Sequence, residues 1–241
     1  RIIKSLISQK HIAKAQDSEA ESRIDYLADI LGLSKREVIS VVERMRQEGI
    51  LADSKDISAY LQDAGDSERK SQILLERFAK LEQYILNHIP DGTLRISYKQ
   101  LNENAVNDGI NTSKEKDIRT LLYFLTIKGY TRKKEDAIHN IEISRQTDLD
   151  STIKRFEKRL EISRFTVEWL YQLASDAEKE NVPGKAIQFS VVELLNQIKS
   201  SSQSLFGGLD DIQLEDVEEA LLYLSKIGSL KLEGGFLVLY N

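Results

Sequence analysis

Several cations and one tyrosine near the middle of the sequence are suited to contact with phosphate groups. They lie on one predicted helix and on the strand after it: Lys116, Arg119, Tyr123, Arg132, Lys133 and Lys134. Lysine and arginine bind phosphate oxygens, and a tyrosine ring can pack against a sugar or a base. The set predicts a local contact with a nucleic-acid backbone. An ordinary solvated, charged hairpin would contain the same lysines, so that alternative stays open.

A second candidate set lies nearer the N-terminus. Arg36, Ser40 and Gln47 share the predicted outer face of a helix, with Arg44 at its edge. Such side chains can donate hydrogen bonds to base edges or phosphates, but Glu43 on the same face opposes contact with phosphate. A polar surface exposed only to solvent is the alternative reading of this face.

A third helix has acidic residues on its predicted outer face. Glu215, Glu218 and Glu219 would repel phosphate, and Leu222 and Lys226 complete the face. An exposed leucine beside carboxylates fits a contact with another protein domain better than a contact with DNA. We therefore expect Glu215, Glu219 and Leu222 to take part in a protein interaction.

The three helices that carry these sets share one pattern, in which an acid precedes an apolar stripe and a glycine ends the helix. The stripes are Val38, Val41, Val42 and Met45 before Gly49; Ile118, Leu121, Leu122 and Leu125 before Gly129; and Val217, Ala220, Leu221 and Leu224 before Gly228. A strand-like segment follows each glycine. The repetition predicts three copies of one unit, each with its stripe buried. The opposite face of the second copy also includes Thr120 and Ile127.

The predicted order of elements is helix, short strand, helix, helix and hairpin, which is typical of a winged helix-turn-helix. We expect three such modules, over residues 1–62, 70–146 and 148–241. The fold class is therefore mainly α with small β-hairpins, arranged as tandem winged helix-turn-helix modules. As winged helices also serve in protein contacts, this fold alone does not assign DNA binding.

Local signals place several element ends. Ser34 and Glu37 form a capping box that begins the third helix of the first module. The second module's hairpin has strands Tyr130–Lys134 and His139–Ser144. A long helix runs from Leu149 to about Glu180, and Gly234-Gly235 predicts a two-residue hairpin in the third module. A helix is also expected over Ile2–Ala15.

The composition limits the classes of function. The net charge of −5 argues against a strong, autonomous nucleic-acid binder, because cations supply most of the affinity for phosphate. The chain has no cysteine, which excludes disulfides and thiol catalysis. No apolar run approaches the roughly 18 residues of a membrane span. We expect a cytoplasmic location and no membrane partner.

Catalytic motifs are missing from the sequence. It contains neither a phosphate-binding G-x-x-x-x-G-K-[ST] loop nor a G-x-S-x-G nucleophile motif. The histidines, His11, His88 and His139, are far apart and lack metal-ligand spacing. We expect no catalytic residue, no metal site and no cofactor in this chain.

The segments Glu48–Ile57, Leu221–Gly228 and Gly234–Asn241 resemble stretches that follow the motor core in very long bacterial RecQ-family ATP-dependent DNA helicases. The resemblance implies an accessory winged-helix region within DNA repair and recombination, with ATP binding confined to the rest of the parent protein. A start at Arg1 also suggests a piece of a longer chain. In this family a winged helix helps to engage and split duplex DNA. That role would map to a turn at Lys133–Lys134, where no aromatic residue is present at the tip.

Two functions follow as hypotheses. The first is a helicase accessory region that contacts DNA weakly and locally, and docks on motor domains of the same chain or of another protein. The second is a tandem winged-helix scaffold for protein interactions in a regulatory or chromosome-organising assembly. A transcriptional regulator is a weaker third, because it would need a clearly basic recognition helix.

Overall fold

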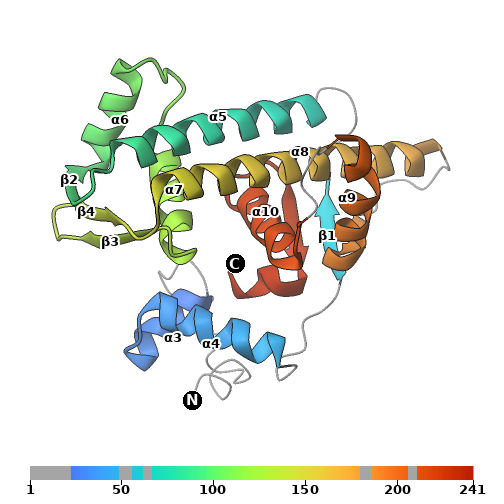
Figure 1. Cartoon of the computed structure of the whole chain (residues 1–241), viewed down its shortest axis with the longest axis horizontal. Helices are drawn as coiled ribbons and strands as arrows, with labels where there is room; N and C mark the ends of the chain where they lie inside the picture. The colour runs from blue at the N-terminus through green and yellow to red at the C-terminus, as the bar shows by residue number, and fades with distance from the viewer. Residues whose placement is uncertain (1–22, 49–55, 62–66, 180–185, 206–210, 241) are drawn as a thin grey trace. The chain divides into compact units, whose positions relative to one another are not determined.

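A computed structural model describes residues 23–48, 56–61, 67–179, 186–205 and 211–240 (Figure 1). Helices form most of the described chain, together with two small sheets of three strands each. The chain divides into two compact units, residues 1–57 with 233–241, and residues 58–232. The mainly helical class with small β elements is therefore confirmed. The helix expected over Ile2–Ala15 and the cap at Gly49 lie outside the described residues.

The first unit contains α3 (Arg23–Leu31), α4 (Lys35–Gln47) and the short 3₁₀ helix η1 (Gly235–Leu239). The predicted capping box is confirmed: the Glu37 backbone N–H donates to Ser34 Oγ at 3.3 Å, and the Ser34 N–H donates to Glu37 Oε2 at 2.8 Å. These bonds satisfy backbone donors that the first turn of a helix leaves open. Apolar side chains of α3 and α4 form the core of this unit.

The apolar stripe of α4 is rotated from its predicted position. Val38, Val42 and Met45 are buried as expected, but Val41 is 40% exposed and Ile39 is buried in its place. With a step of about 100° per residue, the buried arc runs from Met45 to Ile39 and is centred on Val42. Val41 lies at the margin of this arc, so its predicted burial was wrong.

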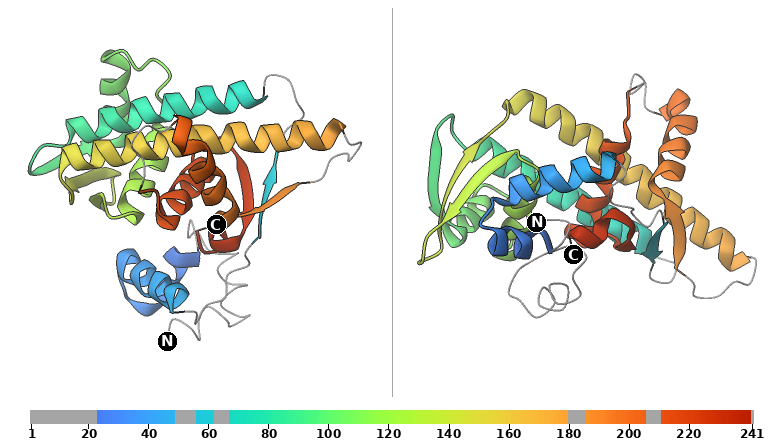
Figure 2. Two further views of the ribbon diagram at one scale, coloured as in Figure 1. Left: turned by 45° about the vertical axis from the view of Figure 1, so that its right-hand side comes forward. Right: turned by 90° about the horizontal axis from the view of Figure 1, so that it is seen from below.

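The larger unit begins with an arrangement that follows the expected order of the second module. Its elements are α5 (Ser67–His88), β2 (Thr93–Ser97), α6 (Tyr98–Asn107), α7 (Glu115–Ile127), β3 (Thr131–Glu135) and β4 (Asn140–Arg145). The strands pair antiparallel in the order β2-β4-β3, and Figure 2 shows the β3–β4 hairpin beside β2. The predicted hairpin is confirmed. Ile141 and Ile143 of the central strand are buried, so one face of the sheet covers the core.

Two local devices set the geometry of this hairpin. Gly129 ends α7 with φ +78°, a left-handed conformation that favours glycine. In the turn between the strands, the Asp136 carboxylate accepts hydrogen bonds from the backbone N–H groups of Ile138 (3.0 Å) and Asn140 (2.9 Å). The turn thus lies at residues 136–139 and not at Lys133–Lys134, which are within β3.

Helix α7 buries more than the predicted stripe. Ile118, Leu121, Leu122 and Leu125 are fully buried as expected, but Ile127, which was assigned to the outer face, is only 4% exposed. Helix α7 contacts α5, α6, β3 and α10, so its buried arc is wider than one stripe. The assignment of Ile127 to an exposed face was wrong.

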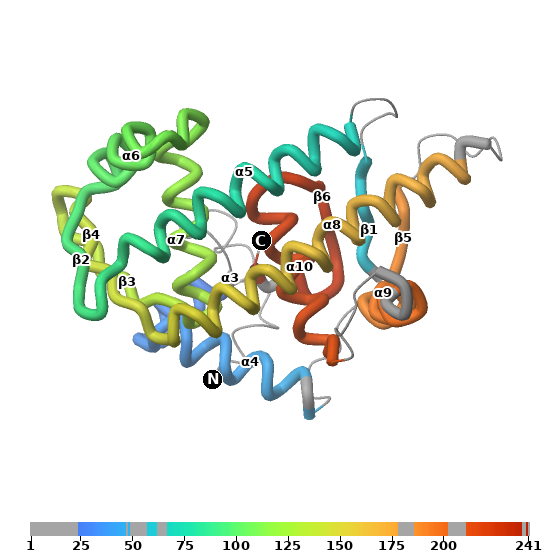
Figure 3. The backbone as a smooth tube through the Cα atoms, turned by 45° about the horizontal axis from the view of Figure 1, so that its top comes forward, coloured from blue at the N-terminus to red at the C-terminus, as the bar shows by residue number. Residues whose placement is uncertain are grey.

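The rest of the larger unit consists of α8 (Leu149–Lys179), β5 (Ile187–Ser190), α9 (Val191–Leu205), α10 (Leu214–Lys226) and the start of β6 (Lys231–Gly234). The predicted long helix is confirmed over Leu149–Lys179. Helices α5 and α8 lie side by side in Figures 1 and 3. Most of the spans 70–146 and 148–241 therefore belong to one compact unit. Among the described residues, no helix combines the length and hydropathy needed to cross a lipid bilayer.

The second sheet contains the strand-like segment that was expected after Gly49, but in a pairing that the sequence pattern did not indicate. Its order is β5-β1-β6, and the central strand β1 (Asp56–Tyr60) comes from far upstream in the chain. The predicted hairpin at Gly234-Gly235 was wrong, since Gly235–Leu239 is a 3₁₀ helix. Phe236 and Leu237 of that helix are buried.

Candidate nucleic-acid interface

The outer face of the β2-β4-β3 sheet is polar and carries exposed cations. Side chains alternate along β3, so Arg132 and Lys134 share this face. The register places Lys134 and Arg95 on either side of Glu142, and Arg95 forms an ion pair with Glu142 at 2.9 Å. Arg132 and Lys134 are exposed and form no ion pair with another described residue. This face therefore has three cations and one carboxylate.

Lys133 lies on the other face of β3, apart from the two neighbours with which the sequence grouped it. Its Nζ donates a hydrogen bond to Tyr98 Oη at 2.7 Å and lies 3.8 Å from Glu135 Oε2. Tyr98, the first residue of α6, is 2% exposed. Lys133 is thus held against the protein, whereas Arg132 and Lys134 extend toward solvent.

Helix α7 contributes one exposed cation and one engaged cation. Lys116 is exposed and has no ion pair within the described part of the chain. The Arg119 guanidinium lies 3.9 Å from the centre of the Tyr98 ring and forms ion pairs with Glu115 (3.1 Å) and Glu135 (3.8 Å). The structure thus brings Arg119 and Lys133 together around Tyr98.

Tyr123 is half-buried near a different neighbour. Lys226 Nζ of α10 lies 5.7 Å from the centre of its ring. The sequence grouped Tyr123 with the hairpin cations because it lies on the helix that precedes them. The contact with α10 was not visible in the sequence, since it joins residues far apart in the chain.

Glu135 is a site residue that the sequence reasoning missed. Its carboxylate accepts a hydrogen bond from Tyr98 Oη at 3.1 Å and lies 3.1 Å from His139 Nδ1. Partial burial alone would raise the pKa of Glu135, but hydrogen bonds with His139 and Tyr98 and the charges of Lys133 and Arg119 outweigh it and hold the pKa below its usual value. The alternation of β3, which puts Lys133 and Glu135 on one face, was the available signal.

The N-terminal candidate set belongs to the first unit. Arg36 is exposed on α4 and has no ion pair within the described residues. Arg44 is also exposed and pairs with Glu48 at 2.9 Å, one turn further along the helix. An exposed pair of this kind contributes little to stability, so Arg44 remains accessible to a ligand.

The proposed acidic interaction face of α10 is not a free surface. Glu215 is exposed, but Glu219 is 7% exposed and Leu222 is fully buried. Helix α10 packs against α7, α8 and α9, so the face that was expected to be exposed contacts other helices. The expected exposure of Glu219 and Leu222 was wrong.

Glu219 instead forms part of the buried core. It accepts a hydrogen bond from Tyr130 Oη at 2.7 Å and lies 4.0 Å from Arg155. Burial and the Glu219 charge raise the pKa of Tyr130. The hydroxyl therefore remains a hydrogen-bond donor at any ordinary pH, and it links the start of β3 to α10.

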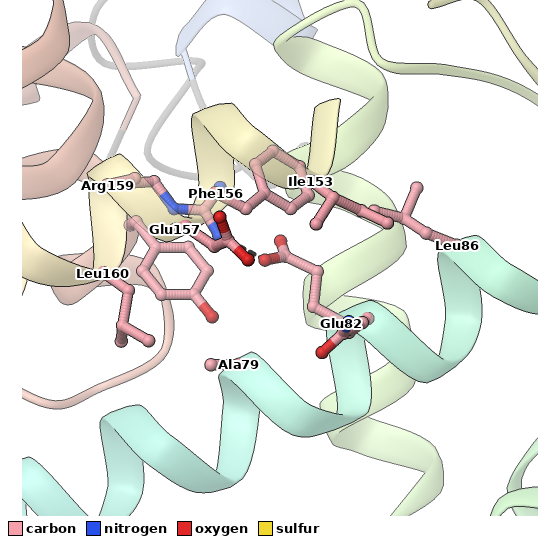
Figure 4. A pocket seen from close by; sticks show the side chains of 10 residues that line it. Ala79, Glu82, Leu86, Ile153, Phe156, Glu157, Arg159 and Leu160 are labelled. Atoms are coloured by element: carbon pink, nitrogen blue, oxygen red, sulfur yellow. Dashed lines mark hydrogen bonds and ion pairs between the residues drawn. The ribbon is translucent and has the colours of Figure 1, made fainter. Parts of the chain in front are cut away.

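A second buried polar group joins α5 to α8. Glu82 and Arg159 form an ion pair in which both side chains are at most 4% exposed. Figure 4 shows Glu82 reaching from α5 toward Arg159 on α8. The Arg159 guanidinium lies 3.8 Å from the Tyr223 ring centre and 4.1 Å from that of Phe156. Burial raises the pKa of Glu82 to about 7, despite the opposing effect of Arg159.

A small pocket opens above this ion pair. Its volume is about 70 Å³, and its walls are mostly apolar, including Leu86, Phe156 and Leu160 (Figure 4). Ligand sites for ordinary substrates are several times larger, about 300–1,000 Å³. The ion pair therefore fits a structural joint between helices better than an active site. No cluster of metal-ligating side chains occurs in the part of the chain that the structure describes.

Two groups of residues thus converge. Arg95, Arg132 and Lys134 share the outer face of the sheet. Arg119 and Lys133 lie near Glu135 on the opposite side of β3. The combination can bind an anionic polymer by charge. No family model, curated protein or solved structure matches the chain.

Proposed function

We propose that this chain is a non-catalytic accessory region of a DNA helicase, which contacts the DNA backbone weakly and docks on the motor domains of the same chain or another protein. The observation that carries the DNA contact is the exposed outer face of the β2-β4-β3 sheet. There, Arg132 and Lys134 extend into solvent without an internal partner among the described residues. Cations in this state can replace the counterions of a phosphate backbone.

The element order supports a winged helix-turn-helix assignment for residues 67–146. The order is helix, strand, helix, helix and hairpin, and the returning strand β4 is central in the sheet. In this assignment α7 is the recognition helix and β3–β4 is the wing. Lys116 near the start of α7 and Arg132 on the wing would then contact the backbone from two elements.

The charge balance supports a weak contact. The net charge of −5 repels phosphate at long range, and Glu142 neutralises part of the sheet face. Such a surface suits an accessory region that binds DNA weakly while the motor domain of the helicase supplies the rest of the affinity for DNA. The resemblance to RecQ-family helicases favours this role in bacterial DNA repair and recombination, with a cytoplasmic location and ATP binding in the motor core.

A protein-interaction scaffold is the second candidate, and one observation favours it. Ile30, Leu33 and Val41 of the first unit are each about 40% exposed. Exposed apolar side chains close together in sequence can mark a protein contact. On this hypothesis the cations of the sheet face would serve only for solubility.

Binding to forked and duplex DNA, measured by fluorescence anisotropy at several salt concentrations, tests the proposal. We expect weak binding that decreases with salt, and a double change Arg132→Ala with Lys134→Ala that lowers the slope of log K against log salt by up to about 2. Arg69→Ala with Lys70→Ala is the matched control, because this pair is exposed on α5 in the same unit. No binding even at about 50 mM salt would favour the scaffold.

A further inference from the structure

Four donor groups surround the carboxylate of Glu135. Oε2 lies 3.1 Å from Tyr98 Oη and 3.8 Å from Lys133 Nζ. Oε1 lies 3.1 Å from His139 Nδ1 and 3.8 Å from Arg119 Nη1. These groups come from α6, α7, β3 and the hairpin turn, so four separate segments converge on one anion.

This arrangement has the chemistry of an oxyanion site. Arginine and lysine form charge-assisted bonds with carboxylate and phosphate alike, since both present more than one oxygen and a negative charge. The Tyr98 ring is buried and packs against the Arg119 guanidinium, which lies 3.9 Å from its centre. The two cations lie beyond hydrogen-bond distance from Glu135 and attract it by charge, while Lys133 donates to Tyr98 Oη at 2.7 Å and Arg119 donates to Glu115 at 3.1 Å.

We propose that Arg119, Lys133, His139 and Tyr98 form a binding site for one phosphate group of a nucleic-acid backbone, and that Glu135 occupies this site as an internal competitor. The inference rests on the proposed function, which it deepens. An incoming phosphate displaces the Glu135 carboxylate and takes its four partners. Glu135 thereby keeps the affinity of the isolated chain for DNA low.

The position of the cluster supports this exchange. β3 is an edge strand of its sheet, with Arg132 and Lys134 on one face and Lys133 and Glu135 on the other. A backbone that runs along this edge can contact both faces. The side chains of Arg119 and His139 are 41% and 73% exposed, so a phosphate can reach them from solvent.

The test compares Glu135→Gln with the wild-type chain in the DNA-binding assay. Glutamine keeps the size of the side chain and removes its charge. We expect about a fivefold gain in affinity at low salt, and a salt slope that is steeper by about 1. Glu103→Gln is the matched control, because Glu103 is also exposed and paired with a lysine, 3.9 Å away, and its loss changes the net charge equally.

A companion variant gives a readout that does not depend on the folding of Glu135→Gln. Glu135 already neutralises Arg119, so Arg119→Gln in the wild-type chain should weaken DNA binding less than twofold, while Arg132→Gln weakens it more. In the Glu135→Gln background, Arg119→Gln should remove the gain. An equal loss for Arg119→Gln and Arg132→Gln in the wild-type chain would overturn the internal competition.

The outcomes separate this inference from the proposed function. If DNA binds but Glu135→Gln equals Glu103→Gln, the competitor role is wrong and the DNA contact stands. If no variant binds DNA, the proposed function fails. Titration of Glu135→Gln with inorganic phosphate, followed by the NMR signals of His139, then decides the anion site alone. Saturable shifts that are absent from wild type would support it, and their absence would overturn it.

Discussion

At the residue scale, the position of a cation along β3 decides its role. Arg132, Lys133 and Lys134 are consecutive and chemically alike, yet the strand directs the middle one to Tyr98 and Glu135 and the other two to solvent. Sequence reasoning predicted the cluster but treated its members as equivalent. The alternation of side chains along the strand separates Lys133 from its two neighbours, and the structure adds the contact with α6.

Glu82 gives a pH prediction at the same scale. Its pKa is about 7 in the folded chain, above the usual 4.5, because burial disfavours the charged carboxylate. Between these values the folded state binds more protons than the unfolded state, so the free energy of unfolding decreases as pH rises. The effect is fully present below pH 4.5 and is lost above pH 7.

Urea unfolding of the wild-type chain and Glu82→Gln between pH 5 and pH 8 measures this contribution. The wild type should lose stability relative to the variant as pH rises, by on the order of 2 kcal/mol. Subtraction of the variant removes the titration of the other groups. A difference between the two proteins that stays constant over this range would show that Glu82 does not change its ionisation there.

At the element scale, the sequence predicted the helices well and their surroundings poorly. The stripe of α10 predicted the burial of Val217 and Leu221, because a helix must bury an apolar face. Leu222 was misassigned because α10 has neighbours on several sides, which no pattern within the helix reveals. The pairing of the central strand β1 was missed for a related reason: its partners β5 and β6 are distant in sequence.

Gly129 shows where a single residue controls an element. Gly129 has φ +78°, and a Cβ built at this position meets no atom within 4 Å. Gly129→Ala therefore causes no clash, but an alanine in this left-handed backbone conformation is less stable than a glycine. We expect a loss of about 1 kcal/mol in thermal or urea unfolding. Gly92→Ala is the control, since Gly92 has equal space and no positive φ. Equal stabilities would mean that the end of α7 does not require this conformation.

At the scale of the larger unit, the expected second and third modules share one core. The ion pair Glu82–Arg159 and the bond from Tyr130 to Glu219 join elements of both spans. Helix α8 contacts both α5 and α10, so it joins the two predicted modules in one core. Residues 58–232 should therefore unfold as one cooperative unit.

Hydrogen exchange of Leu221→Ala in α10 tests this cooperativity. Leu221 is fully buried, and its truncation should cost about 2–5 kcal/mol. Amides that exchange only when the whole unit unfolds all lose protection by the amount that the substitution lowers the free energy of unfolding. The amides of α5 and α7 should therefore lose as much protection as those of α10. Val192→Ala, at a side chain that is 55% exposed on α9, should leave all three unchanged. If α10 lost protection while α5 and α7 kept theirs, the two modules would unfold independently, and the polar contacts between them would not couple their stabilities.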